Sequence, residues 1–194
     1  MKITFITLAL FSFGTISAQE SKFNRECSIS SGYGYANRLG NSIGGPDFFI
    51  QMSYQLNKQF SIATEFENMF YKLPGYYPDF VFFPTKTNKQ YIFDNYYSLL
   101  IKYHLPFSSR LRASIASGWT FYTRQNEYYL YFQDSTSETV YPITTSFSDF
   151  SIPFLLETQY PIWKNLSVGL RVKYNFNPLQ GNTYSASVAA SLHL

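Results

Sequence analysis

The chain has little charge and almost no cysteine. Of its 194 residues 14% are charged, whereas soluble domains average about 25%. The single cysteine excludes a disulfide framework and a cysteine-rich metal site. The net charge is only +3 and the basic residues do not cluster, which argues against nucleic-acid binding. No apolar run reaches the roughly 18 residues that a transmembrane helix needs.

Aromatic residues are abundant instead. They make up 21% of the chain, with 18 Tyr and 20 Phe, and 45% of all residues are apolar. This apolar content excludes a disordered chain, and the length suits a single domain.

The first residues have the pattern of a secretory signal peptide. Lys2 precedes an apolar run from Ile3 to Phe13, and small residues lead to a cleavage site after Ala18. The alternative is a membrane anchor, but that needs about 20 apolar residues. We therefore expect a signal peptide over residues 1–18 and one mature domain over residues 19–194.

The remaining sequence alternates between apolar and polar residues, which is typical of two-faced β-strands. Leu170 and Val172, for example, flank Arg171. All charged residues within the expected strands fall on the polar parity and none on the apolar parity. The expected strands span residues 27–37, 47–56, 60–70, 92–105, 110–124, 148–160, 166–176 and 184–194.

The connections between these strands alternate in length. Short links follow the second, fourth and sixth strands, and longer links follow the first, third and fifth. Aromatic residues gather at both ends of the apolar stripe. These features predict an all-β fold, an eight-stranded antiparallel up-and-down transmembrane β-barrel in the outer membrane. The alternative is a soluble barrel or sandwich, whose strands usually have roughly five or six residues.

The segment from Phe150 to Pro161, followed by Leu166-Ser-Val-Gly-Leu170, resembles the penultimate hairpin of small, porin-like outer-membrane β-barrel proteins of Bacteroidota. The end of the signal peptide is also similar to theirs. The resemblance implies an outer-membrane barrel whose last strand is recognised by the barrel assembly machinery through a terminal aromatic residue. Here the chain ends in Leu194, which keeps the apolar parity but lacks the aromatic ring.

An eight-stranded barrel encloses a space that side chains just fill, so inward charges should pair with one another. Glu65 and Arg171 lie at matching distances from the short turns, and so do Glu67 and Lys173. This predicts a salt-bridged lumen rather than proton chemistry, with a gated ion path as the alternative. The expected lumen charge cluster comprises Glu65, Glu67, Asp94, Lys102, Arg112, Arg124, Glu157, Arg171 and Lys173.

The two histidines give no strong indication of chemistry. His104 and His193 share the inward parity near the short turns, but a metal site needs three or four ligands. We therefore expect them to be polar filling, with no metal and no cofactor. A lipid A-modifying barrel enzyme is a lesser alternative, because it needs a base near the lipid-facing wall, where no histidine falls. We expect no enzymatic activity.

Two expected outer loops, residues 72–90 and 125–147, are rich in aromatic residues. Tyr-rich surfaces bury large areas at low entropic cost, which favours binding of a surface partner or glycan. The alternative is that these rings pack on one another and on lipopolysaccharide. Residues 128–133 and 139–143 are expected to continue as a hairpin above the membrane. The candidate binding residues are Tyr76, Tyr77, Phe80, Phe82, Tyr128, Tyr129 and Tyr131.

The sequence thus predicts a monomer with a structural or surface-interaction role and a charge-plugged lumen. Its expected partners are outer-membrane lipid and lipopolysaccharide, the assembly machinery during insertion, and a surface ligand. The alternative function is a narrow pore for small solutes or ions.

Overall fold

The computed structural model describes residues 26–39, 43–73, 90–106, 111–133, 138–179 and 181–194. The expected signal peptide (residues 1–18) lies outside the described residues, and so do Tyr76, Tyr77, Phe80 and Phe82. Among the described residues, no helix is long and apolar enough to cross a membrane.

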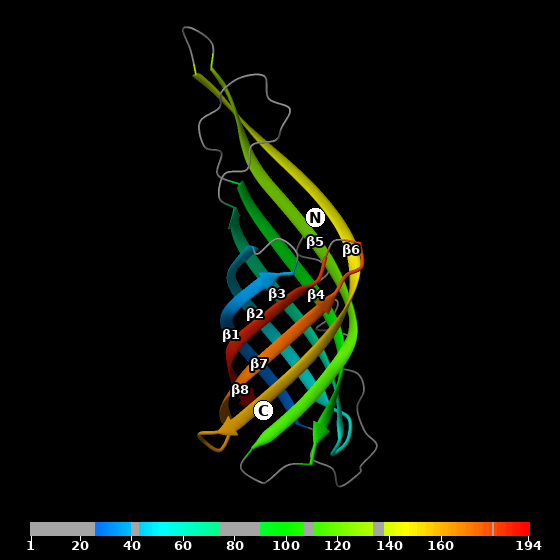
Figure 1. The fold of residues 1–194 in the computed structure, drawn as a ribbon. Helices are drawn as coiled ribbons and strands as arrows, with labels where there is room; N and C mark the ends of the chain where they lie inside the picture. The colour runs from blue at the N-terminus through cyan, green and yellow to red at the C-terminus, as the bar shows by residue number, and fades with distance from the viewer. Residues whose placement is uncertain (1–25, 40–42, 74–89, 107–110, 134–137, 180) are drawn as a thin grey trace.

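Eight antiparallel strands close into one barrel (Figure 1). Each strand pairs with its neighbours in sequence, and the last strand pairs with the first, for example through Tyr33 and Val188. The predicted up-and-down barrel is confirmed. The strands are β1 (Cys27–Arg38), β2 (Ile43–Gln55), β3 (Phe60–Leu73), β4 (Gln90–Leu105), β5 (Arg112–Gln133), β6 (Glu138–Pro161), β7 (Leu166–Phe176) and β8 (Thr183–His193).

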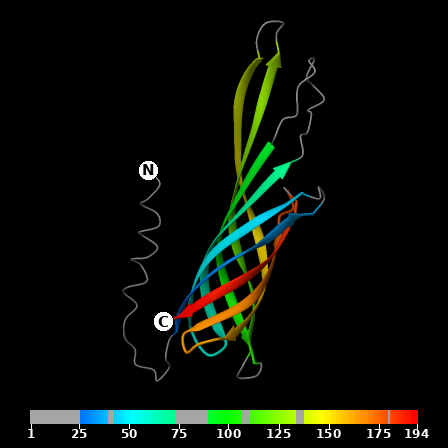
Figure 2. The same ribbon diagram turned by 90° about the vertical axis from the view of Figure 1, so that its left-hand side faces the viewer.

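Two of the expected long links are largely strand. β2 begins at Ile43, so the link between β1 and β2 shrinks to residues 39–42. Pro46 is tolerated in β2 because it pairs only with Tyr35 of β1, while the pairing with β3 starts one residue later. β5 and β6 pair as far as Gln133 and Glu138, so they rise above the other strands as a hairpin (Figures 1 and 2).

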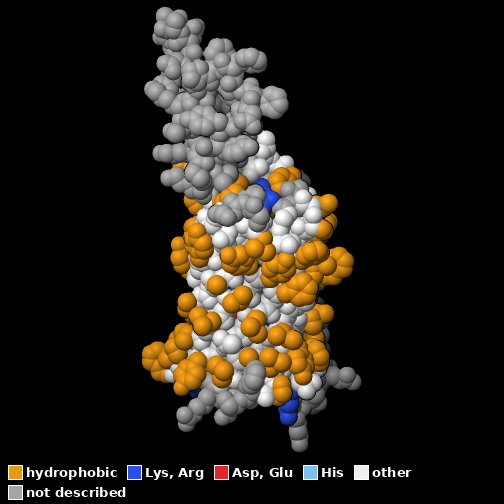
Figure 3. Space-filling model, viewed as in Figure 1, with side chains coloured by type: hydrophobic (Ala, Val, Ile, Leu, Met, Phe, Trp, Pro, Cys, Tyr) orange, Lys and Arg blue, Asp and Glu red, His pale blue; other side chains and the backbone are white. Residues whose placement is uncertain are grey.

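The two faces of the strands differ as the alternation predicts. Many outward residues are large and apolar, and they gather in bands on the face that Figure 3 shows. Leu170 is 63% exposed, whereas its neighbour Arg171 is 1% exposed. Because the exposed side chains are apolar and the buried ones are charged, the barrel is built for surroundings of lipid.

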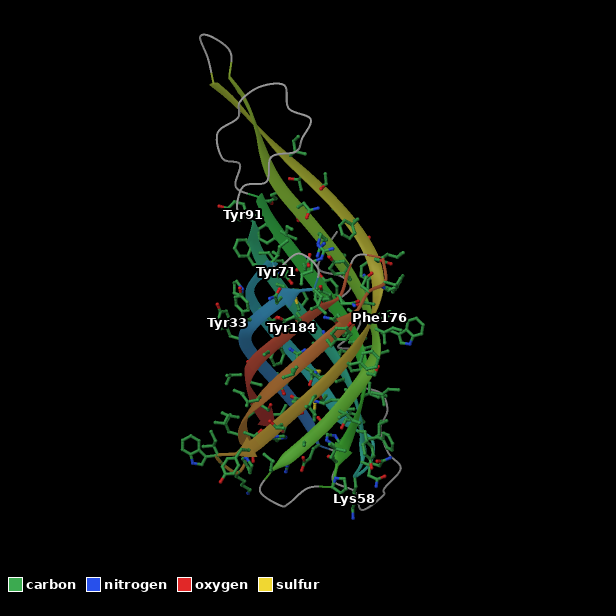
Figure 4. The ribbon with its side chains drawn as sticks, viewed as in Figure 1. Tyr33, Lys58, Tyr71, Tyr91, Phe176 and Tyr184 are labelled. Atoms are coloured by element: carbon green, nitrogen blue, oxygen red, sulfur yellow. The ribbon has the colours of Figure 1, made fainter. Side chains whose placement is uncertain are left out.

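Aromatic pairs stand near both ends of the outward face. Phe70 and Phe93 lie 5.0 Å apart between ring centres near the long-loop end. Phe60 and Tyr103 lie 5.2 Å apart near the short turns. Such girdles occupy the two interfaces of a bilayer. Figure 4 shows Tyr33 projecting outward and Lys58 at the short-turn end.

The lumen is not wholly polar, which the sequence analysis did not foresee. Large apolar and aromatic side chains face inward beside the charges, and Figure 4 shows Tyr71 inside the barrel. They alternate in step with the inward-facing charged residues of the same strands. Their position along the strand, and not their hydropathy, therefore makes them face the lumen. One cluster, near the long-loop end, comprises Ala36, Met69, Tyr71, Ile92, Tyr96 and Tyr122, and a second comprises Ala63, Leu100, Ala116 and Leu155.

Candidate functional site: the barrel lumen

Four charged side chains meet across the middle of the lumen, and we term them the lumen plug: Glu65 and Glu67 of β3, and Arg171 and Lys173 of β7. Lys173 Nζ lies 2.7 Å from Glu65 Oε1 and 2.5 Å from Glu67 Oε2. Arg171 Nη2 lies 2.6 Å from Glu65 Oε1. All four side chains are at most 5% exposed.

The plug spans the barrel from one wall to the other. β3 and β7 are separated by β4–β6 on one side and by β8, β1 and β2 on the other. Their side chains therefore approach from opposite walls. Since every second residue of a strand faces inward, Glu65 and Glu67 project together, and so do Arg171 and Lys173. The ion pairs consequently cross the lumen and obstruct it.

Neutral polar groups complete the plug. Gln51 donates a hydrogen bond of 2.8 Å to Glu65 Oε2, and the Ser185 hydroxyl donates one of 2.9 Å to Glu67 Oε1. Lys173 also donates to the Ser98 hydroxyl at 3.3 Å. These groups come from β2, β8 and β4. Several walls of the barrel thus hold the two carboxylates and the ammonium in place.

Phe49 holds the other side of Arg171. The Arg171 guanidinium carbon lies 3.9 Å from the centre of the Phe49 ring. The guanidinium nitrogens have no hydrogen-bond partner among the described residues, so the ion pairs with Glu65 and Glu67 and the aromatic face provide its described contacts. Phe49 is fully buried. Its aromatic side chain gave no reason to expect a role in the lumen, and its inward parity is the signal in the sequence that points to this position.

Asp47 is a further buried carboxylate that the predicted cluster omitted. It is 1% exposed, and the Ser187 hydroxyl donates to its Oδ2 at 2.9 Å. Its Oδ1 has no hydrogen-bond partner within the described part of the chain. Its place on the inward parity was visible in the sequence, but the sequence offered no pairing partner for it.

A second ion pair lies between the plug and the short turns. Lys102 of β4 pairs with Glu157 of β6 and donates to Gln51 Oε1 at 2.8 Å. Gln51 thereby links this pair to Glu65, because the same amide contacts both. The lower lumen charges and the plug form one connected network.

Below this pair, a cavity of ≈ 290 Å³ opens toward the short turns, and both histidines line it. His104 Nε2 lies 2.5 Å from the Ser61 hydroxyl, and His193 Nε2 lies 3.0 Å from the Ser167 hydroxyl. No group of three or more His, Cys, Asp or Glu side chains within the described ranges is arranged to hold a metal ion.

A third ion pair closes the long-loop end of the lumen. Asp94 and Arg124 lie opposite each other on β4 and β5, and Arg124 donates to both carboxylate oxygens at 2.7 and 2.5 Å. The Tyr122 hydroxyl also donates to Asp94, at 3.2 Å. The guanidinium carbon of Arg124 lies 5.5 Å from the centre of the Phe147 ring. This pair links adjacent strands rather than opposite walls.

Arg112 does not join these buried pairs. Its side chain is 56% exposed and lies 3.5 Å from the carboxylate of Glu26, which is 46% exposed. The reason is its position, because β5 begins at Arg112 and the side chain therefore sits at the short-turn rim. Arg112 lines the cavity at the rim together with Lys102 and Glu157 of the predicted lumen charge cluster.

The predicted loop-binding residues are not brought together by any described contact. The backbones of Tyr128, Tyr129 and Tyr131 lie in the raised part of β5, opposite Ile143, Pro142 and Val140 of β6. Their side chains lie outside the described part of the structure.

No family model matches the chain, and no curated protein matches its sequence. Solved structures do share its fold. A major outer membrane protein from Thermus thermophilus is similar with a TM-score of 0.62 and 12% identity, over 89% of this chain and 100% of that one. The fold is that of an outer-membrane β-barrel.

Two further barrels agree with this conclusion. Ail, the attachment invasion locus protein of Yersinia pestis, in complex with the heparin analogue sucrose octasulfate, has a TM-score of 0.58 and 13% identity, over 89% of this chain and 100% of that one. The N-terminal β-barrel domain of Pseudomonas aeruginosa OprF has a TM-score of 0.50 and 12% identity, over 87% and 97%. With its apolar outward band, the barrel is located in the outer membrane, surrounded by lipid.

Proposed function

We propose that this barrel is a closed, monomeric outer-membrane protein that acts at the cell surface through its raised β5–β6 hairpin and outer loops. The observation that carries the proposal is the plug, whose ion pairs join opposite walls of the lumen. A route for ions or solutes would have to break these buried contacts, and each broken contact strands a charge away from water.

We infer lipopolysaccharide and a surface ligand as partners outside the cell and the assembly machinery as a partner during insertion. The likeness in fold to Ail, the attachment invasion locus protein, supports a surface role. We propose that the chain is related to the small outer-membrane barrels of Bacteroidota that it resembles. We also propose that its role does not involve catalysis.

A planar-bilayer recording of the refolded protein tests the closed lumen. We expect no steady conductance from the native barrel, because the plug crosses it. The double variant Glu67→Ala/Lys173→Ala should conduct in steady steps, since it removes an opposed pair from the plug. The matched control is Glu26→Ala/Lys58→Ala, which also removes one acid and one base but at the short-turn rim, and it should stay silent.

The opposite result would favour the narrow pore. Steady steps from the native protein, with an ion selectivity that changes in Arg171→Glu, would show that the lumen conducts. The heat-dependent shift in gel mobility that folded barrels show would establish that each variant tested is folded.

A further inference from the structure

In the described part of the chain, the upper half of β6 is paired on one side only. Its pairing with β7 begins at Ile152, opposite Phe176, whereas its pairing with β5 continues to Glu138, opposite Gln133. Among the described residues, no backbone hydrogen bond joins residues 138–151 of β6 to a segment other than β5. This part of β6 is an open sheet edge above the barrel, as Figures 1 and 2 show. We term residues 143–149 the β6 edge.

One side-chain contact shows which backbone groups face outward from this edge. The N–H of Phe150 donates to the Asp149 carboxylate at 2.8 Å, and the N–H of Ile162, which has the same parity, donates to the Leu166 carbonyl on the β7 side. Successive N–H groups of a strand point to alternate sides. The N–H groups of Thr144, Ser146 and Ser148 therefore face the same open side as that of Phe150. The Asp149 carboxylate accepts from the lowest of these N–H groups, that of Phe150. The three N–H groups above it have no hydrogen-bond partner among the described residues.

Within the described part of the chain, the β6 edge lacks several of the features that usually protect an open strand. Natural edges are protected by lysine, proline, bulges or covering segments. Residues 143–149 contain no lysine and no proline, and Pro142 bounds the edge at its upper end. Their register against β5 is continuous, so no bulge interrupts it. Asp149 is the only charged residue in this stretch, and it lies at the lower end.

We propose that the β6 edge is a docking site for an extended segment of a soluble protein outside the cell, bound by β-strand addition. The proposal deepens the surface role proposed above and rests on it. An open row of backbone donors and acceptors is complementary to an extended backbone. The acidic side chains beside the edge, Asp149 and Glu127 (opposite Thr144 on β5), favour a segment with net positive charge.

A second copy of the barrel does not fit this edge. Two barrels in the same membrane are related by an axis along the membrane normal, so both β6 strands run from the outside inward. Strands of such barrels tilt by roughly 35–45° from the normal, so this rotation makes the two β6 strands cross at about twice that angle. A continuous ladder needs strands that run nearly alongside each other. The occupant is therefore a chain that is free to orient itself, outside the membrane.

Amide hydrogen exchange, followed by NMR on the refolded protein in lipid nanodiscs, tests the proposal. In the free protein, we expect the amides of Thr144, Ser146 and Ser148 to exchange faster than those of Thr145 and Phe147, which face β5. The probe is the peptide Lys-Thr-Val-Thr-Val-Thr-Lys. It should slow exchange at the three open amides. The same peptide, N-methylated at alternate residues along its pairing side, should not slow it.

Two variants provide the matched comparison. Ser146→Pro removes an open N–H while leaving the β5-facing ladder intact, because proline is tolerated at a sheet edge. It should weaken peptide binding about tenfold, as expected for one backbone hydrogen bond. Ser146→Ala removes the hydroxyl but keeps the N–H, and it should bind the peptide as the native protein does.

Several outcomes would overturn the docking site. One is that the open-side amides of the free protein are as protected as the β5-facing amides, or that their protection depends on protein concentration alone. Another is that the N-methylated peptide binds as well as the unmodified one, or that Ser146→Pro binds the peptide as well as the native protein does. The last is that the peptide has no effect on exchange at about 1 mM. None of these affects the conductance result. Failure of the docking site and failure of the closed lumen can thus be told apart.

Discussion

The Arg171 guanidinium carbon lies 3.9 Å from the centre of the Phe49 ring, while its Nη2 lies 2.6 Å from Glu65. Phe49 belongs to β2, Arg171 to β7 and Glu65 to β3. A cation held between a ring face and a carboxylate is favourable where water is scarce. Arg171 therefore joins three strands of the wall and is the central cation of the plug.

The Phe49 ring should contribute measurably to stability. We expect Phe49→Leu to lower the free energy of unfolding by about 1–2 kcal/mol, because leucine fills much of the space but offers no aromatic face to the cation. Urea unfolding from lipid bilayers measures the change. The control is Phe48→Leu on the lipid-facing side, where the side chain is 41% exposed. An equal loss in both variants would show that the ring has no special role.

Glu67 and Lys173 should show strong energetic coupling. Each single variant, Glu67→Gln or Lys173→Met, removes one charge from the buried plug and leaves the others unbalanced, so it should lower the free energy of unfolding by about 3 kcal/mol. The double variant should lose less than the sum of the two, with a coupling of about 1–3 kcal/mol. Additive losses from the same urea experiments would contradict the 2.5 Å contact between them.

Neighbouring residues of β7 should respond to charge in opposite ways. Leu170→Arg places a charge on the lipid-facing side and should lower the free energy of unfolding by about 2–4 kcal/mol. Arg171→Leu removes a charge from the plug and leaves Glu65 with Lys173 and Gln51 only, so we expect a loss of about 3 kcal/mol. Val172→Leu is the control on the same strand. Normal stability of Leu170→Arg would contradict the register of β7.

Gly169 should tolerate no side chain. A Cβ there would lie 1.7 Å from the carbonyl oxygen of Thr158 on β6, closer than real contacts allow, so the two strands would have to separate. We expect Gly169→Ala to reduce the folded fraction, measured by heat-dependent gel mobility. Val168→Ala, beside it on the outward side, should fold nearly as well as the native chain. Equal folding of both variants would show that the strands can move apart there.

The sequence predicted the architecture because one physical period governs it. Side chains of a strand alternate between two faces, and the membrane and the narrow lumen impose opposite demands on those faces. The alternation therefore predicts that Leu170 faces lipid and that its neighbour Arg171 faces the lumen. The same rule placed Glu65, Glu67 and Lys173 inside the lumen before any contact was known.

Inward parity did not identify all the residues that matter. Phe49 and Tyr122 face inward although both are aromatic, because position along the strand decides the face. Arg112 has the same parity as Arg124 but lies at the rim, because β5 starts there. The hairpin of β5 and β6 depends on pairing between distant residues, so the sequence could suggest it but could not establish how far β6 extends beyond β7.

The sequence by itself therefore determined the number of strands, the face of each residue and the location in the outer membrane, since these follow from local alternation and from strand length. The heights of residues along the strands pointed to Glu65 with Arg171 and Glu67 with Lys173. Only the tertiary structure decided that Lys173 also meets Glu65 and which edge stays open. Strand tilt and closure set the relative heights of residues on different strands. They bring Lys173 to Glu65 and Glu67 and place Arg171 on Phe49. Among the described residues, they leave Thr144, Ser146 and Ser148 of β6 with β5 on one side and no strand on the other.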